Sequence, residues 1–148
     1  MQSSMTSNSN PPPDSPESSV GPDQVAADGL TLAENEHARI IGMLQKATEA
    51  FIRQASPAEV NAILLDLSGY TLSHFRAEEK LMSSLAYPGI ETHKREHEQL
   101  ADQVRRLLDV PSKQEALQTA VSVLDIWLDA HLRITDKEFF DFLRRKNQ

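Results

Sequence analysis

The chain has 148 residues, the length of one domain, which excludes an enzyme built from several domains. It carries 22 acidic and 15 basic residues, a formal net charge of −7, and no cysteine. Nucleic acid binding needs a cluster of lysine and arginine, so this charge argues against a nucleic acid partner. Without cysteine there is no disulfide, zinc–thiolate cluster or catalytic thiol, and any metal must be held by histidine and carboxylates.

The first 30 residues differ in composition from the rest of the chain. They hold five of the eight prolines and no lysine, arginine or histidine. Such a segment cannot bury a core, so we expect residues 1–30 to form a disordered polar, acidic tail and residues 31–148 to form the folded domain. No apolar run reaches the length of a membrane-spanning helix and the N-terminus lacks the features of a secretory signal. The expected location is therefore the cytoplasm, without a membrane partner.

Four amphipathic helices are predicted after the tail, from apolar residues at helical spacing and from the breaks between them. The first covers about residues 32–55, and the second begins at Pro57, behind a capping box of Ser56 and Glu59. Proline-containing breaks at residues 87–89 and 110–112 delimit the third helix, and a second capping box at residues 112–115 begins the fourth. Short connections between four helices favour an all-α, antiparallel up-down-up-down four-helix bundle.

Polar residues interrupt the apolar faces of these helices. Two pairs, His74 with Glu78 and His93 with His97, have a spacing of four, which places each pair one turn apart on one face. Five imidazoles and a carboxylate in a core without metal would leave polar atoms unpaired, whereas two metal ions would use all of them. Imidazole with bridging carboxylates favours iron, and helical bundles commonly hold two such metals. The five histidines on or beside the predicted inner faces are His37, His74, His93, His97 and His131.

Asp136 is a further candidate donor, but a regular helix does not place it beside His131. The separation of five residues corresponds to about 140° around the helix axis. The apolar stripe shows the same shift, since Trp127 and His131 share one phase whereas Asp136 and Phe139 fit a phase displaced by one residue. We therefore predict a π-type widened turn within residues 131–136.

Three motifs together resemble those of the hemerythrin family, specifically its single-domain bacterial members. Residues 74–82 are similar to the family's His-Phe-x-x-Glu-Glu-x-x-Met, residues 87–97 to its Tyr-Pro followed by His-x-x-x-His, and residues 127–136 to its Trp-Leu-x-x-His-x-x-x-x-Asp. Two positions depart from the family pattern. Residues 32–37 read Leu-Ala-Glu-Asn-Glu-His where the family usually has Ile-Asp-x-Gln-His, and Phe139 stands where it often has tyrosine.

The resemblance implies a non-haem di-iron centre with a solvent-derived oxo or hydroxo bridge. One iron would be bound by His93, His97 and His131, the other by His37 and His74, and both would be bridged by Glu78 and Asp136. The resemblance also implies reversible dioxygen binding at an open position of the second iron, in an apolar pocket lined by Phe75, Trp127 and Leu128. Ordinary core packing would bury these three side chains equally well. The expected role is storage, delivery or sensing of dioxygen by a monomer that is not an enzyme.

Two other functions stay open at the level of the sequence. A di-iron redox enzyme acting on dioxygen, peroxide or nitric oxide would use the same donors. Such enzymes in ferritin-like bundles carry a Glu-x-x-His motif on each of two helices, and here Glu34 and His37 alone have this spacing. A structural or interaction bundle would fold identically without metal.

Overall fold

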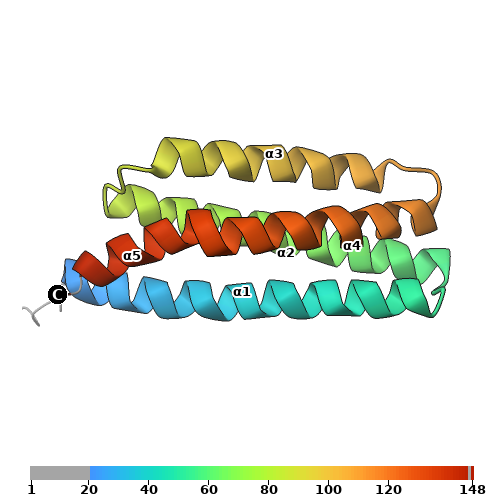
Figure 1. The fold of residues 1–148 in the computed structure, drawn as a ribbon, viewed down its shortest axis with the longest axis horizontal. Coiled ribbons are helices and arrows are strands. Elements are labelled where there is room, and N and C mark those ends of the chain that lie inside the picture. Colours follow the sequence, from blue (N-terminus) through green and yellow to red (C-terminus); the bar gives the residue numbers. More distant parts are fainter. Residues whose placement is uncertain (1–20, 147) are drawn as a thin grey trace, which may run out of the picture.

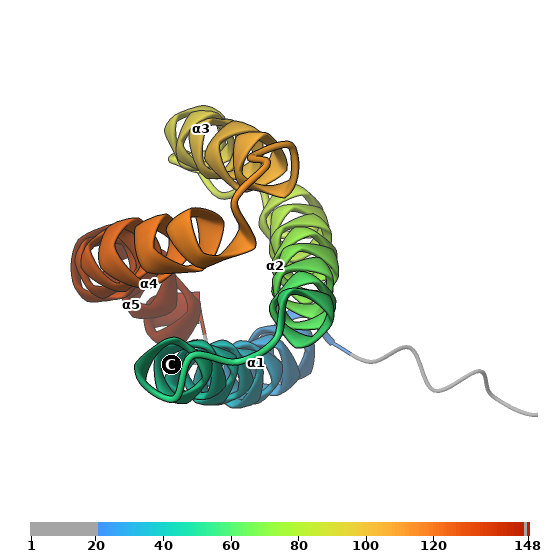
Figure 2. The ribbon, with the colours of Figure 1, turned by 90° about the vertical axis from the view of Figure 1, so that its right-hand side faces the viewer.

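The computed structural model describes residues 21–146 and residue 148, and within them it contains helices and no strand. The elements are α1 (Pro22–Ile52), α2 (Pro57–Ser84), α3 (Ile90–Leu108), α4 (Lys113–Ala130), the π-helical turn η1 (His131–Thr135) and α5 (Asp136–Lys146). Because α4, η1 and α5 follow one another without a break, they form one long rod, whose end lies beside the start of α1 (Figure 1). Seen end-on, the four rods enclose one core, which confirms the predicted all-α bundle (Figure 2). No helix in the described ranges has both the length and the apolar character needed to cross a membrane.

The starts of α2 and α4 follow the predicted capping residues. The hydroxyl of Ser56 accepts a hydrogen bond from the Glu59 backbone N–H, and that of Ser112 accepts one from the Glu115 N–H, both at 3.3 Å. The Glu59 carboxylate does not complete its capping box, because it pairs with the Arg53 guanidinium instead. One side-chain cap therefore satisfies a free backbone donor at each predicted start.

The predicted beginning of the first helix is wrong, because α1 starts at Pro22 and not near residue 32. Pro22 suits a first helical turn, where its missing N–H costs nothing. Ala26 and Ala33 are buried against Met82 and Phe139, so this early part of α1 covers one end of the core. The expected tail of residues 1–30 is thus helical from residue 22 onward. Its remainder, residues 1–20, lies outside the described residues, and disorder there stays a prediction.

A polar layer divides the buried core into two apolar clusters. On α2, Leu67 belongs to one cluster and Met82 to the other. On the last rod, Leu128 belongs to the first cluster and Phe139 to the second. The predicted donor residues lie between these positions in both rods, so the apolar packing on either side fixes where the polar layer sits.

The turn η1 confirms the predicted irregularity after α4. The Asp136 backbone N–H donates to the His131 carbonyl oxygen, which is the i to i+5 hydrogen bond of a π-helix. Ala130 and Asp136, on either side of the turn, have ordinary α-helical dihedral angles. One additional residue is therefore absorbed in a single turn, which brings Asp136 and Phe139 to the inner face, each with 0% exposure.

Candidate metal centre

The structure brings all seven predicted donor residues together in the polar layer. Each of the four rods contributes, and every one of these side chains is buried, the most exposed being His37 at 7%. The donors are His37 on α1, His74 and Glu78 on α2, His93 and His97 on α3, and His131 and Asp136 at the two ends of the π-helical turn.

The donors form two overlapping groups, in each of which one donor atom per residue lies within 4.8 Å of all the others. The three-histidine group contains His93, His97 and His131. The two-histidine group contains His37 and His74. Both groups also include the same two carboxylates, Glu78 and Asp136, so these side chains are shared.

Asp136 lies between the two groups with one carboxylate oxygen toward each. Its Oδ2 is 3.0 Å from His37 Nε2, whereas its Oδ1 is 3.0 Å from His93 Nε2 and 2.8 Å from His131 Nε2. Glu78 is not equally close to the two groups. Its Oε2 lies 3.2 Å from His93 Nε2 but 3.9 Å from His74 Nε2. Asp136 therefore has the position of a bridging carboxylate, and Glu78 lies nearer to the three-histidine group.

Of the short distances around the two carboxylates, the one between His93 Nε2 and Glu78 Oε2 has the geometry of a hydrogen bond. Within the described part of the chain, Glu78 Oε1 and both Asp136 carboxylate oxygens have no hydrogen-bond partner. Two ligands at right angles around an ion about 2.1 Å away are about 3.0 Å apart. The separations in the polar layer match this value, so the carboxylates fit metal ligands better than partners of a hydrogen-bond network.

The orientation of two histidines also requires a cation between them. His97 Nδ1 donates to Glu79 Oε1 at 2.9 Å, and His131 Nδ1 donates to Glu96 Oε2 at 3.0 Å. Because a carboxylate can only accept, each Nδ1 carries the proton and the Nε2 of each neutral ring points a lone pair inward. These two Nε2 atoms are 3.2 Å apart. Two lone pairs at this separation repel, so either a metal ion or an added proton must lie between them.

Burial and neighbouring charges act in opposite directions on the groups of the polar layer. Burial raises the pKa of Glu78, but His93 and His97 outweigh it and lower this pKa to about 2. Burial also raises the pKa of Asp136, and His131, His37 and His93 together bring it far below its usual range. Burial lowers the pKa of His93, but Asp136 and Glu78 raise it to about 9. Protonated His93 is therefore a counter-ion of both carboxylates in the metal-free protein, and a bound metal would replace its proton.

The metal-free protein is expected to lose stability as the pH rises from 6.5 to about 9. A histidine whose pKa is raised by folding stabilises the protein below its unfolded pKa, and this contribution disappears as the pH passes the folded value. The free energy of unfolding should fall by an amount on the order of 3 kcal/mol. Urea unfolding at a series of pH values, with a chelator present, measures it. Metal-loaded protein is the control and should show the opposite trend, since protons compete with the metal; a flat profile for the metal-free protein would contradict the prediction.

Aromatic rings cover the faces of three donor histidines. Phe75 stacks on His97 with ring centroids 3.8 Å apart, and Trp127 stacks on His131 at 4.3 Å. A third ring, Phe140, stacks on His37 at 5.4 Å. The sequence analysis predicted Phe75 and Trp127 as pocket residues, but it did not assign a role to Phe140. All three restrict the rotation of a histidine ring, which keeps its nitrogen directed at the polar layer.

A small cavity adjoins the two-histidine group. Its volume is about 20 Å³, enough for one molecule of the size of water. The predicted pocket residues Phe75, Trp127 and Leu128 line it, together with His37 and His74. Both histidines of the two-histidine group line the cavity, whereas His131 is the one member of the three-histidine group that does so, and the cavity therefore lies mainly beside the group that has fewer histidines.

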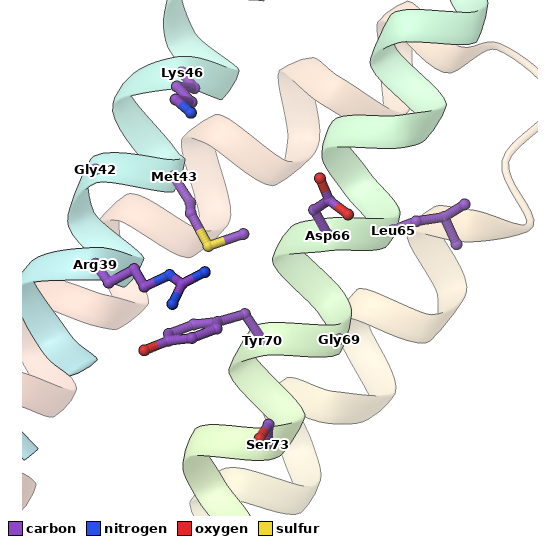
Figure 3. A pocket seen from close by; sticks show the side chains of 9 residues that line it. All are labelled: Arg39, Gly42, Met43, Lys46, Leu65, Asp66, Gly69, Tyr70 and Ser73. Carbon is purple, nitrogen blue, oxygen red and sulfur yellow. The ribbon is translucent and has the colours of Figure 1, made fainter.

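A larger hollow of about 760 Å³ lies at the surface between α1 and α2 (Figure 3). In it the Arg39 guanidinium lies 4.5 Å from the centre of the Tyr70 ring. Gly42 and Gly69 leave the hollow open, since a Cβ added at either position would meet nothing within 4 Å. None of the seven donors lines it. The candidate site is thus identified by convergent polar groups and not by the size of the hollow.

The sequence analysis missed the carboxylates that hold the outer nitrogens of the histidines. Glu36 accepts from His74, Glu79 from His97 and Glu96 from His131. The sequence does contain a signal for them, because each glutamate is the immediate neighbour of a donor residue. A position beside an inward-facing residue lies at the edge of the helix interface, from which a glutamate can reach the next helix.

A helical bundle with a buried, shared set of histidines and carboxylates defines the protein as a cation-binding bundle. The chain belongs to the hemerythrin family, since the family described as Hemerythrin HHE cation binding domain matches residues 28–143. It is 31% identical over 116 residues to a protein named Bacteriohemerythrin from Stenotrophomonas maltophilia, covering 76% of this chain and 74% of the relative. A Bacteriohemerythrin from Pseudomonas aeruginosa is 29% identical over 120 residues, covering 78% and 76%, and one from Clostridium acetobutylicum is 24% identical over 119 residues, covering 76% and 92%. No solved structure matches the chain.

Proposed function

We propose that the chain holds two iron ions and uses them to bind dioxygen reversibly. The observation that carries this proposal is the unequal size of the two donor groups beside one cavity. Three histidines, two carboxylate oxygens and a solvent bridge fill an octahedral shell, whereas two histidines leave the other shell one ligand short. Both histidines of the group that is one ligand short line the cavity, while the other group contributes His131 alone. A diatomic molecule in the cavity would therefore meet the open position.

The residues around the cavity would protect this chemistry. A bound iron pair supplies an open coordination position and two electrons for dioxygen. Phe75 and Leu128 present no hydrogen-bonding group, so this wall of the cavity offers no proton to a bound anion. Glu78 and Asp136 would hold both ions, and histidine ligands would add no negative charge. An apolar wall of this kind would limit the access of water and protons, which favours release of intact dioxygen over further reaction.

Three leucines separate the cavity from the surface. Leu44, Leu128 and Leu132 line both the buried cavity and a surface groove of about 440 Å³ between α1 and α4. An apolar partition of this kind resists water and ions more strongly than it resists a small apolar gas. It supports the assignment of Leu128 to the dioxygen pocket.

Tyrosine in place of Leu128 is expected to accelerate autoxidation of the oxygenated protein by about tenfold or more, because it brings a hydroxyl donor to the cavity. The decay of the oxygenated visible spectrum under air measures this rate. Ile126→Tyr is the matched control, since Ile126 is 74% exposed on the same helix and should leave the rate unchanged. An unchanged lifetime in Leu128→Tyr would remove Leu128 from the pocket.

The position of Glu34 favours binding of dioxygen over enzymatic turnover. Glu34 and His37 have the Glu-x-x-His spacing of ferritin-like oxidases. Glu34, however, is exposed and lies 3.7 Å from the Arg144 guanidinium. It contributes nothing to the donor groups, so the ligand set is rich in nitrogen and poor in carboxylate.

Anaerobic loading with Fe(II), followed by iron analysis and visible spectra, tests the proposal. We expect two irons per chain and an absorption band that appears in air and disappears when oxygen is removed. Two irons that oxidise once, without a recoverable oxygenated form, would refute reversible binding and favour a redox enzyme. An iron content no higher than that of a variant lacking the donor histidines would refute the metal centre itself.

A further inference from the structure

Three glutamates connect the donor histidines from one helix to the next around the bundle. Glu36 on α1 accepts from His74 on α2, with His74 Nδ1 and Glu36 Oε2 2.8 Å apart. Glu79 on α2 accepts from His97 on α3 at 2.9 Å. Glu96 on α3 accepts from His131, at the end of α4, at 3.0 Å. In each contact, a glutamate on one helix accepts a hydrogen bond from a histidine on the helix that follows it in the chain.

The series of contacts stops between the last rod and α1. Among residues 21–146, no carboxylate makes this outer contact with His37, which Phe140 covers by stacking instead. His93 is also outside the series, and its buried Nδ1 has no hydrogen-bond partner among the described residues. The three-histidine group therefore has two histidines held by carboxylates, whereas the two-histidine group has one.

The contact of Glu96 is reinforced by the π-helical turn. The Thr135 hydroxyl donates to Glu96 Oε2 at 2.8 Å, the same oxygen that accepts from His131. Thr135 belongs to the turn that also brings Asp136 inward. The π-helical turn thus places the Asp136 carboxylate among the donor residues and the Thr135 hydroxyl against Glu96.

We propose that Glu36, Glu79 and Glu96 are positioning residues, which lock three histidines in the Nδ1–H tautomer and set how tightly each metal is held. This inference rests on the proposed metal centre and adds to it which ion is the weaker. A carboxylate behind a ligating histidine fixes the ring and makes its inner nitrogen a stronger donor. In the two-histidine group, only His74 is positioned by a glutamate. The ion in this group is therefore the first to be lost.

The side chains of the three glutamates are partly exposed, at 20%, 26% and 36%, so substitution does not open the core. Glu→Gln preserves the shape of the side chain and removes the charge, and an amide no longer enforces one histidine tautomer. Glu98 provides a matched control, because it is exposed, follows His97 directly and carries the same charge. Glu98→Gln removes one negative charge from α3 without touching a donor histidine.

The experiment measures Co(II) binding to the full chain by competition with a chelator, and it also records the visible spectrum of the bound Co(II) and the imidazole ¹⁵N shifts of the metal-free protein. We expect Glu36→Gln to weaken the second, looser Co(II) by about 10- to 100-fold. Glu79→Gln and Glu96→Gln should weaken the first Co(II) by a similar factor and shift its spectrum. Glu98→Gln should change both constants by no more than about twofold, since exposed charges are screened.

The outcomes separate the two proposals. Failure of the wild-type chain to bind Co(II) would refute the metal centre, whereas normal binding with all four variants equal would refute the positioning role alone. If Glu96→Gln is unfolded by circular dichroism, Thr135→Val replaces it, since it keeps the charge of Glu96 and removes the hydrogen bond to this side chain. Unchanged ¹⁵N shifts of His131 in both Glu96→Gln and Thr135→Val would likewise overturn the assignment.

Discussion

Alanine in place of Glu78 is expected to lower bound iron from two ions to about one per chain or fewer, because this carboxylate belongs to both donor groups. Its Oε2 lies 3.2 Å from His93 Nε2 and 3.3 Å from His97 Nε2, so the three-histidine group also loses a ligand. Iron analysis after anaerobic loading, with the visible spectrum in air, measures the effect. Asp66→Ala is the control, since it removes an exposed carboxylate from the same helix.

The same variant should also change the metal-free protein in a specific way. Glu78 is one of the two carboxylates that raise the pKa of His93 to about 9. Without it, the fall in stability between pH 6.5 and 9 should become smaller. A Glu78→Ala chain that retains two irons, an unaltered spectrum and the full pH dependence would show that this carboxylate is not a ligand.

The donor residues could be predicted from the sequence because their positions follow from helical geometry. The spacing of four in His74 with Glu78 and in His93 with His97 fixes a common face on any regular helix. The apolar residues on the same stripe show that this face points inward. The shift in phase after His131 was informative for the same reason, since an apolar stripe must stay on the inner face.

The parts that sequence analysis missed depend on contacts between helices. The start of α1 at Pro22 is stabilised by packing of Ala26 against the far end of the chain, which local composition does not report. Phe140 can stack on His37 only because the π-helical turn rotates α5 into place. The glutamates behind the histidines look like ordinary surface charges until the neighbouring helix is positioned.

Deletion of Ile134 is expected to leave both irons in place, although it removes a residue between two of the proposed ligands. Without it, His131 and Asp136 are four residues apart, and a regular α-helix then puts them on one face. Ile134 is 63% exposed, so its loss creates no cavity. Because the widened turn absorbs the additional residue, the length of the rod should hardly change, and the inner side chains of α5 should keep their phase.

Deletion of Ile126 is the matched control and should have the opposite result. Ile126 is also an exposed isoleucine, at 74%, but it lies in the regular part of the same rod. Its removal turns Trp127, Leu128 and His131 by about 100° away from the core, so the three-histidine group is broken. Iron analysis and circular dichroism of both deletions distinguish the two cases. If deletion of Ile134 abolishes iron binding in a folded chain, the π-helical turn does more than restore phase, and the Thr135 contact to Glu96 becomes the reason to retain it.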